Sequence, residues 1–275
     1  MPPILHPSSG NSTAMSPPSS AERWARFLEE HAPGLTWLAA TLLEWSELPP
    51  GARRAWTVTI QAARSGEVSS LVAMQEETGV LAVAAMPDAP PPLFGEPSRV
   101  RRALGAPETL EALVAQVPEL LLRRGPGVRR SVFVYDGEPR RRYPSVRRAA
   151  VTAVDELERF RARAGGEWMS MTAGDLLGPV NQGHVFELVR ENETAGMFRV
   201  EAIAARRVQV ADVCIDPDLR GRGLGRALLE SAAAVARSEY ARGCVVAVPA
   251  EEVAERTARG AGFLAAGTIE DLEFA

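Results

Sequence analysis

Residues 207–230 read RVQVADVCIDPDLRGRGLGRALLE and determine how the C-terminal part of this 275-residue chain folds. At their start, apolar residues alternate with polar ones, which is typical of a strand with one buried face. The alternation then changes phase, because the apolar positions run Val208, Val210 and then Ala211, Val213 and Ile215. A slipped period within one strand is what a β-bulge produces. We therefore predict a bulge that splays this strand from its neighbour.

The loop after this strand is rich in glycine and arginine. Residues 220–226 read RGRGLGR, and an amphipathic helical pattern follows directly. Glycines allow consecutive backbone N–H groups to turn inward without obstruction by side chains. The N-terminus of a helix adds unpaired donors and positive dipole, and three arginines add charge. The ligand expected for such a loop is a polyanion, and a pyrophosphate in particular.

Two well-known phosphate loops do not fit this stretch. A Walker loop requires Gly-Lys-Ser/Thr, and the chain contains no lysine. A dinucleotide fingerprint requires a glycine where Arg226 stands and an acidic residue at the end of the next strand. Neither pattern is met, which disfavours a nucleotide-binding oxidoreductase.

The rest of the C-terminal half, residues 146–275, alternates between helical and extended patterns. We expect strands at 146–151, 184–189, 197–203, 207–215, 244–248 and 269–274, and helices at 154–163, after the glycine-rich loop and from Pro249. The extended segments outnumber the helices, and most follow one another through short turns. The pattern predicts a sheet with helices packed against it.

The N-terminal half, residues 21–138, follows a Pro/Ser-rich stretch at residues 1–20 that we interpret as a disordered tail. We expect two short helices between Trp24 and Leu43, strands at 56–60, 69–74, 80–85 and 132–135, and a helix through Leu110–Leu121. Residues 139–145 form the predicted linker. The order of elements is similar in the two halves, which suggests an internal duplication. The N-terminal half has the proline-rich DAPPPLFGEP, residues 88–97, in place of a glycine-rich loop.

Composition limits the classes of protein this chain can be. It is 46% hydrophobic and 24% charged, and no apolar run approaches the roughly 18 residues that span a bilayer. The net charge of −4 gives no strongly basic surface, so we expect neither a membrane nor a nucleic-acid partner. Cys214 and Cys244 are too few for a disulfide framework and lack metal-site spacing. We expect a cytoplasmic protein without a metal site, since the N-terminus does not resemble a secretory signal either.

Arg220, Gly223 and Gly225 match the pattern Q/R-x-x-G-x-G/A, between a predicted strand and a predicted helix. In this the chain resembles the GNAT N-acetyltransferase superfamily, from about residue 146 to the end and including the closing pair Gly262–Phe263. The ending ARGAGFLAAGTIEDLEF and the weakly marked first half resemble bacterial predicted GNAT acetyltransferases in which a degenerate GNAT-like half precedes a catalytic one. The resemblance implies an α/β (α+β) fold: a mixed, mostly antiparallel sheet flanked by helices, in two related halves.

The resemblance also implies acetyl-CoA as co-substrate. Its pyrophosphate would lie on the loop formed by Arg220, Gly221, Arg222, Gly223, Leu224, Gly225 and Arg226. Its pantetheine arm would pair with the main chain of Val213, Cys214 and Ile215. The bulge inferred from the phase change is a feature of this family and would open the wedge that admits the thioester. Structural interpretations remain open for these residues. The loop arginines could be solvated surface charges, and the two cysteines could be buried, inert thiols.

A carboxylate near that wedge commonly deprotonates the acceptor amine in this family. Asp212 is the first candidate, and Glu201 and then Glu187 follow, although each could equally be structural. The family's tyrosine, which protonates the departing thiolate, is replaced by Ala258. Thr257, Tyr240 and Tyr143 are the hydroxyl groups that could substitute for it.

Two function hypotheses follow. The leading one is an acetyl-CoA-dependent N-acetyltransferase acting on an amine of a small molecule. The principal alternative, motivated by Ala258, is a protein of the same fold that binds CoA without turnover and has a regulatory or binding role.

Overall fold

The computed structural model describes residues 20–47, 56–138, 143–164 and 176–275. Most of the predicted tail, residues 1–19, and part of the predicted linker, residues 139–142, lie outside the described residues. No helix within the described ranges combines the length and the apolar composition that crossing a membrane requires.

The strands of the described residues form one sheet of eleven, in the order β1-β2-β3-β4-β11-β5-β10-β9-β8-β7-β6. Their bounds are β1 Trp56–Ala62, β2 Val68–Gln75, β3 Val80–Ala85, β4 Arg102–Gly105, β5 Arg124–Tyr135, β6 Val146–Arg148, β7 Val185–Arg190, β8 Glu193–Ile203, β9 Arg207–Ile215, β10 Gly243–Pro249 and β11 Leu264–Phe274. The pairs β3–β4 and β9–β10 are parallel and the others are antiparallel. The prediction of a mixed, mostly antiparallel sheet is confirmed.

Helices flank both faces of this sheet. They are α1 Ser20–His31, α2 Thr36–Glu47, α3 Pro107–Gln116, α4 Pro118–Arg123, α5 Val154–Ala164, α6 Leu177–Asn181, α7 Leu224–Tyr240 and α8 Glu252–Gly260. The apolar clusters place α1, α2, α5 and α6 on one face and α3, α4, α7 and α8 on the other. The predicted wedge between β9 and β10 therefore has helices of the C-terminal half on one face of the sheet and helices of the N-terminal half on the other.

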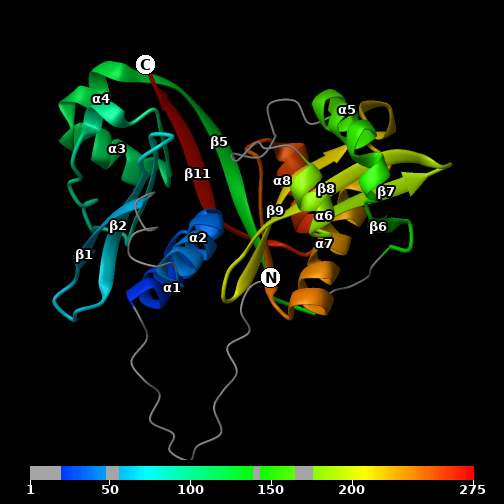
Figure 1. Ribbon diagram of the computed structural model, residues 1–275, viewed down its shortest axis with the longest axis horizontal. Helices are drawn as coiled ribbons and strands as arrows, with labels where there is room; N and C mark the ends of the chain where they lie inside the picture. The colour runs from blue at the N-terminus through cyan, green and yellow to red at the C-terminus, as the bar shows by residue number, and fades with distance from the viewer. Residues whose placement is uncertain (1–19, 48–55, 139–142, 165–175) are drawn as a thin grey trace, which may run out of the picture.

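The two halves exchange their last strands. β5, from the N-terminal half, pairs with β10 of the C-terminal half, and β11, from the C-terminal half, pairs with β4 of the N-terminal half. β5 and β11 also pair with each other and run side by side through the centre of the molecule (Figure 1). Each half thus completes the sheet of the other, and the sheet is continuous across the sequence boundary at residues 138–146.

The bulge predicted from the phase change in β9 is confirmed. Between the pairs Met197–Cys214 and Arg199–Ala211, two steps along β8 correspond to three along β9. Asp212 lies within this interval and has a φ of +53°, in the left-handed region that non-glycine residues rarely adopt. β9 pairs with β10 only as far as Val210, opposite Val246, although both strands continue beyond. The two strands therefore diverge where the bulge begins, as the sequence indicates.

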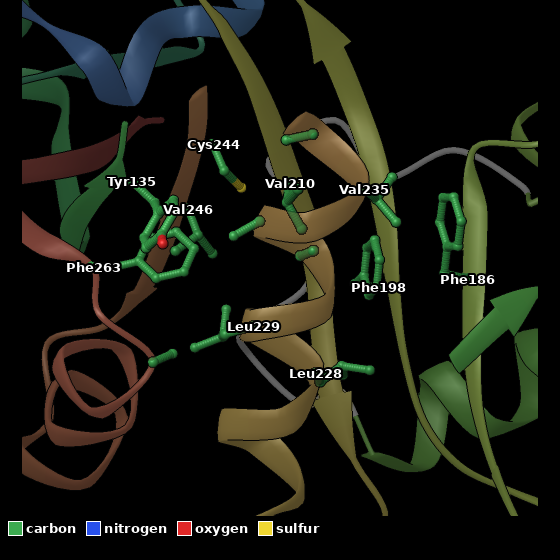
Figure 2. Packing of buried hydrophobic residues seen from close by; sticks show 14 of the residues in the cluster. Tyr135, Phe186, Phe198, Val210, Leu228, Leu229, Val235, Cys244, Val246 and Phe263 are labelled. Carbon is green, nitrogen blue, oxygen red and sulfur yellow. The ribbon is translucent and has the colours of Figure 1, made fainter. Parts of the chain in front are cut away.

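Helix α7 packs into the core of the C-terminal half. Leu228, Leu229 and Val235 project from it toward side chains of β8, β9 and β10 (Figure 2). The rings of Phe186 and Phe198 stack with centroids 4.8 Å apart beside this helix. Because this packing fixes α7 on the sheet, the N-terminus of the helix is held at the open end of the wedge.

The structure differs from the sequence-based expectations at a few elements. β4 was not expected, because four residues are too few to show an alternating pattern. The single helix expected through residues 110–121 is interrupted at Pro118, which cannot donate the helical hydrogen bond. β11 begins at Leu264 rather than at 269, because its exposed first residues pair with β5 without showing an apolar pattern.

Candidate functional site

A cavity of about 440 Å³ lies where β9 and β10 diverge. The glycine-rich loop and α7 line its mouth, on one face of the sheet. Arg130, Glu201 and Gln209 line it as well. Gln209 accepts a hydrogen bond at 2.8 Å from the backbone N–H of Trp37 in α2. The three residues Arg130, Glu201 and Gln209 therefore line the cavity on the opposite face of the sheet, which α1 and α2 cover. The cavity therefore passes through the wedge from the α7 face to the α1–α2 face.

The glycine-rich loop has the geometry of an anion cradle. Gly221 and Gly223 have φ values of +76° and +78°, and a Cβ at either would meet only open space. The N–H groups in the first turn of an α-helix have no partner within the helix. In α7, which begins at Leu224, no side chain caps them either. A Cβ at Gly225 would lie 3.3 Å from Thr257 of α8, so the absence of a side chain permits close packing there. These amides are oriented for a phosphate group.

The three loop arginines lie in different environments. Arg220 lines the cavity and donates from Nη2 to the carbonyl oxygen of Ala164 at 3.0 Å, which ties the loop to the end of α5. Arg226 also lines the cavity and pairs with Glu230 at 2.9 Å one helical turn later. The exposed side chain of Arg222 is not among the lining residues. The structure thus brings Arg220 and Arg226, but not the Arg222 side chain, to the cavity.

The segment of β9 beyond the bulge forms one wall. Val213, Cys214 and Ile215 all line the cavity, and none pairs with β10. Their edge is therefore open to an extended ligand that binds as a strand does. Burial, together with the charge of Asp212, raises the pKa of the Cys214 thiol to about 12, so this thiol stays protonated at neutral pH.

Asp212 lies at the bulge and lines the cavity, but its carboxylate is held in a buried ion-pair network. Oδ2 accepts a hydrogen bond from Nε of Arg199 at 2.9 Å and lies 3.5 Å from Nη1 of Arg161 in α5. The side chain is fully buried. Removal of this carboxylate would leave two buried guanidinium groups poorly compensated, which is costly.

Glu201 lies on the neighbouring strand and also lines the cavity. Between the pairs Val200–Val210 and Ala202–Gln209, β8 has one extra residue, and that residue is Glu201. This second bulge restores the register disturbed in β9. Glu201 accepts hydrogen bonds from Nη2 of Arg199 at 3.3 Å and from Nε2 of Gln209 at 2.7 Å. Glu187 instead accepts from Arg147 and Thr194 and does not line the cavity.

Comparison with known proteins places this site in a family. Residues 153–263 match the family model described as Acetyltransferase (GNAT) family. The chain carries a GNAT acetyltransferase domain. This match covers the bulge, the loop, α7 and α8, and it ends at Phe263, the second residue of the closing Gly-Phe pair. No curated protein shows significant similarity to the chain.

Solved structures share the fold beyond the GNAT domain. A GCN5-related N-acetyltransferase from Sphaerobacter thermophilus has a TM-score of 0.56 at 13% identity, covering 92% of this chain and 91% of that chain. A GCN5-related N-acetyltransferase from Kribbella flavida has a TM-score of 0.53 at 15% identity, covering 93% of this chain and 95% of that chain. At such low identity these similarities show the fold alone, and they extend it over both halves.

The GNAT domain has no tyrosine among the described residues that line its cavity. Ala258 is fully buried in the core beside α7. Thr257 lines the cavity, but its hydroxyl donates to the carbonyl oxygen of Val253 at 2.8 Å. Tyr240 and Tyr143 are not among the lining residues, and burial raises the pKa of Tyr240. None of the hydroxyl groups considered from the sequence is positioned in the cavity as an available acid.

Sequence reasoning missed Arg130 and Gln209, two polar residues that line the cavity of the GNAT domain. Gln209 belongs to β9, and its place on the polar side of the alternation is the signal that could have identified it. Arg130 belongs to β5 of the N-terminal half, and only the strand exchange brings it to this cavity.

Proposed function

We propose that this protein transfers an acetyl group from acetyl-CoA to an amine of a small molecule. The observation that carries the proposal is the cavity itself, which joins an uncapped helix N-terminus to the opening between β9 and β10. Two buried thiols, neither in a disulfide, support a reducing, cytoplasmic setting.

The residues present fit acetyl-CoA. The N–H groups from Gly221 to Arg226 would bind the pyrophosphate, and the open edge of Val213 to Ile215 would pair with the pantetheine arm. The left-handed conformation of Gly221 and Gly223 leaves room for phosphate oxygens beside the backbone. When bound, acetyl-CoA supplies an activated acetyl thioester.

The acceptor amine must be neutral to attack the thioester, so a proton has to leave it. Glu201 and Asp212 are the proposed catalytic carboxylates, and their surroundings suggest different roles. Glu201 lines the cavity on the α1–α2 face and would accept the proton directly or through water. Asp212, with its two arginine partners, would hold Arg199 in place and so orient Glu201.

The departing thiolate receives no proton from a tyrosine in this proposal. An ordinary thiol has a pKa of about 8.5, so its thiolate is a tolerable leaving group near neutral pH. A positioned general acid typically contributes about 10²–10⁴ in rate, so we expect slow turnover. No specific observation favours the alternative of a CoA-binding protein without turnover.

The test combines binding with turnover in the full-length protein. CoA, acetyl-CoA and longer acyl-CoAs are compared by thermal shift, because ligands of the native state raise the melting temperature. Release of free CoA thiol is then measured with acetyl-CoA and a panel of amines, and Glu201→Gln should lower the rate by about 10²–10⁴. Binding without thiol release would support the non-catalytic alternative. Absence of any CoA binding, with stabilisation by NADH, would overturn the proposal.

A further inference from the structure

Arg130 occupies an unusual position in the cavity. It lies on β5 opposite Pro249 of β10. Its neighbour two residues on, Val132, packs in the cluster with α1 and α2, so alternation along the strand places Arg130 on that face. The residue is only 7% exposed and lines the cavity. Its Nη1 is buried and makes no hydrogen bond to any described residue.

The charge of Arg130 is only partly compensated by the protein. Its Nη1 lies 3.6 Å from Oδ2 of Asp271, beyond hydrogen-bond distance. Asp271 is already held by Arg102, whose Nε donates to Oδ1 at 2.6 Å and whose Nη2 contacts Oδ2. Burial lowers the pKa of Arg130, and the nearby Arg102 lowers it further, while Asp271 and Glu201 raise it. One carboxylate is therefore shared by two guanidinium groups.

A buried guanidinium with an unused N–H donor is expensive to maintain without a partner. Arg130 is one of the residues that line the cavity, so a partner can enter there, and a planar carboxylate suits the geometry of a guanidinium. Glu201 lines the same cavity with the opposite charge. A cation and an anion that line one cavity are complementary to a small molecule that carries both an amine and a carboxylate.

We propose that Arg130 binds the carboxylate of the acceptor, and that the acceptor is an amino acid or another small amine bearing a carboxylate. This inference rests on the proposed acetyl transfer. The amine would lie beside Glu201 and the opening between β9 and β10, and the carboxylate would lie against the guanidinium of Arg130, which lines the same cavity. The N-terminal half would thus supply a specificity-determining residue to a reaction carried out by the GNAT domain.

The experiment measures kcat and KM, by release of CoA thiol, for amino acids and for the matching amines that lack the carboxylate. Aminoalkyl phosphates of similar length form a third arm. Arg130→Gln removes the charge and Arg130→Lys keeps it. Arg129→Gln is the matched control, because Arg129 is adjacent on the same strand, is half-exposed and pairs with Glu270 instead of lining the cavity. Melting temperatures are recorded for every variant.

We expect the wild type to prefer the amino acid of each pair by about 10- to 100-fold in kcat/KM. This is the size of effect expected when a substrate gains a hydrogen bond to a charged group. Arg130→Gln should abolish this preference by raising KM for amino acids far more than KM for the carboxylate-free amines. Arg130→Lys should restore part of the preference, and Arg129→Gln should retain all of it. The wild-type preference tests the inference even where a variant does not fold.

Other outcomes overturn the inference in distinguishable ways. Thiol release that favours carboxylate-free amines or aminoalkyl phosphates would contradict a carboxylate partner while leaving the acetyltransferase proposal intact. An equal loss toward all amines in Arg130→Gln would show a structural role only. Absence of thiol release with every amine would overturn the proposed function, and this inference with it.

Discussion

The two parallel strand pairs of the sheet, β3–β4 and β9–β10, have the same topology but different surroundings. Each pair has four residues in register, Val80–Val83 with Arg102–Gly105 and Arg207–Val210 with Gly243–Val246. The connection between β9 and β10 contains the glycine-rich loop and α7. The connection between β3 and β4 is proline-rich, and its described residues contain no α-helix.

The two pairs also differ in how close the strands remain. A Cβ at Gly105 of β4 would lie 2.6 Å from the carbonyl oxygen of Val83, so β3 and β4 stay close together at their ends. β9 instead contains a bulge and continues past the paired region, where the cavity opens. A parallel pair of strands alone therefore does not make the site. The site requires a bulge to separate the strands and a helix N-terminus at the opening.

Removal of residues 1–138 should have the largest effect on the molecule. It would leave β10 and β11 without β5, exposing strand edges and apolar surface in the middle of the sheet. We expect an aggregated product with no soluble, active fraction, measured by size-exclusion chromatography and thiol release. Co-expression of the two halves as separate chains is the control and should restore soluble protein. A soluble, fully active fragment would contradict the importance of the strand exchange.

Gly223→Glu should abolish acetyl-CoA binding. The carboxylate would stand beside the pyrophosphate, and like charges in contact cost several kcal/mol, so the dissociation constant should rise at least about 100-fold. Gly66→Glu is a matched control, because Gly66 has a similar φ of +82° and an equally open environment but lies in the β1–β2 turn. Calorimetry of both variants separates the effect on binding from backbone strain. Unchanged binding in Gly223→Glu would refute the loop assignment.

Calorimetric titration of the wild type should give one CoA per chain. The β3–β4 connection offers neither an opened wedge nor the N-terminus of an α-helix among its described residues. A stoichiometry of two would show that the N-terminal half binds CoA by means other than the geometry of β9 and β10.

Ala258→Tyr should destabilise the protein rather than increase its rate of turnover. Ala258 is fully buried in the core beside α7, and overpacking of such a position typically costs about 1–3 kcal/mol. The measurement is thermal or denaturant unfolding together with kcat. Arg256→Tyr, on the exposed face of the same helix, is the control and should change stability by less than about 0.5 kcal/mol. Faster turnover at unchanged stability would show that the core can accept the missing general acid.

Arg226→Ala and Arg222→Ala should have the smallest effects on CoA binding, and unequal ones. Arg226 lines the cavity, whereas the side chain of Arg222 does not. Because exposed charges are screened by water and salt, we expect a loss of about two- to fivefold for Arg226→Ala and less than about twofold for Arg222→Ala. Titrations at low and high salt check this order. A larger effect of Arg222→Ala would show that its side chain reaches the bound pyrophosphate.

Features that arise within short stretches of the chain could be predicted from the amino-acid sequence. The bulge followed from the change of phase around Val210, because each residue on a strand alternates between two faces and an extra residue must shift the pattern. The glycine-rich loop and the start of α7 followed from residues 220–226, since glycine conformation and helix ends depend on local sequence. The missing tyrosine at Ala258 could likewise be identified from a short motif.

Which distant residues meet at this cavity could not be predicted from local sequence patterns. Pairing between strands depends on the edges that the rest of the fold leaves available, and no local pattern in β5 or β11 indicates that they exchange partners. This pairing brings Arg130 to a cavity formed by residues about 35 to 130 positions later in the chain. The engagement of Asp212 by Arg161 and Arg199 was hidden for the same reason, because buried ion pairs are set by packing and not by spacing along the sequence.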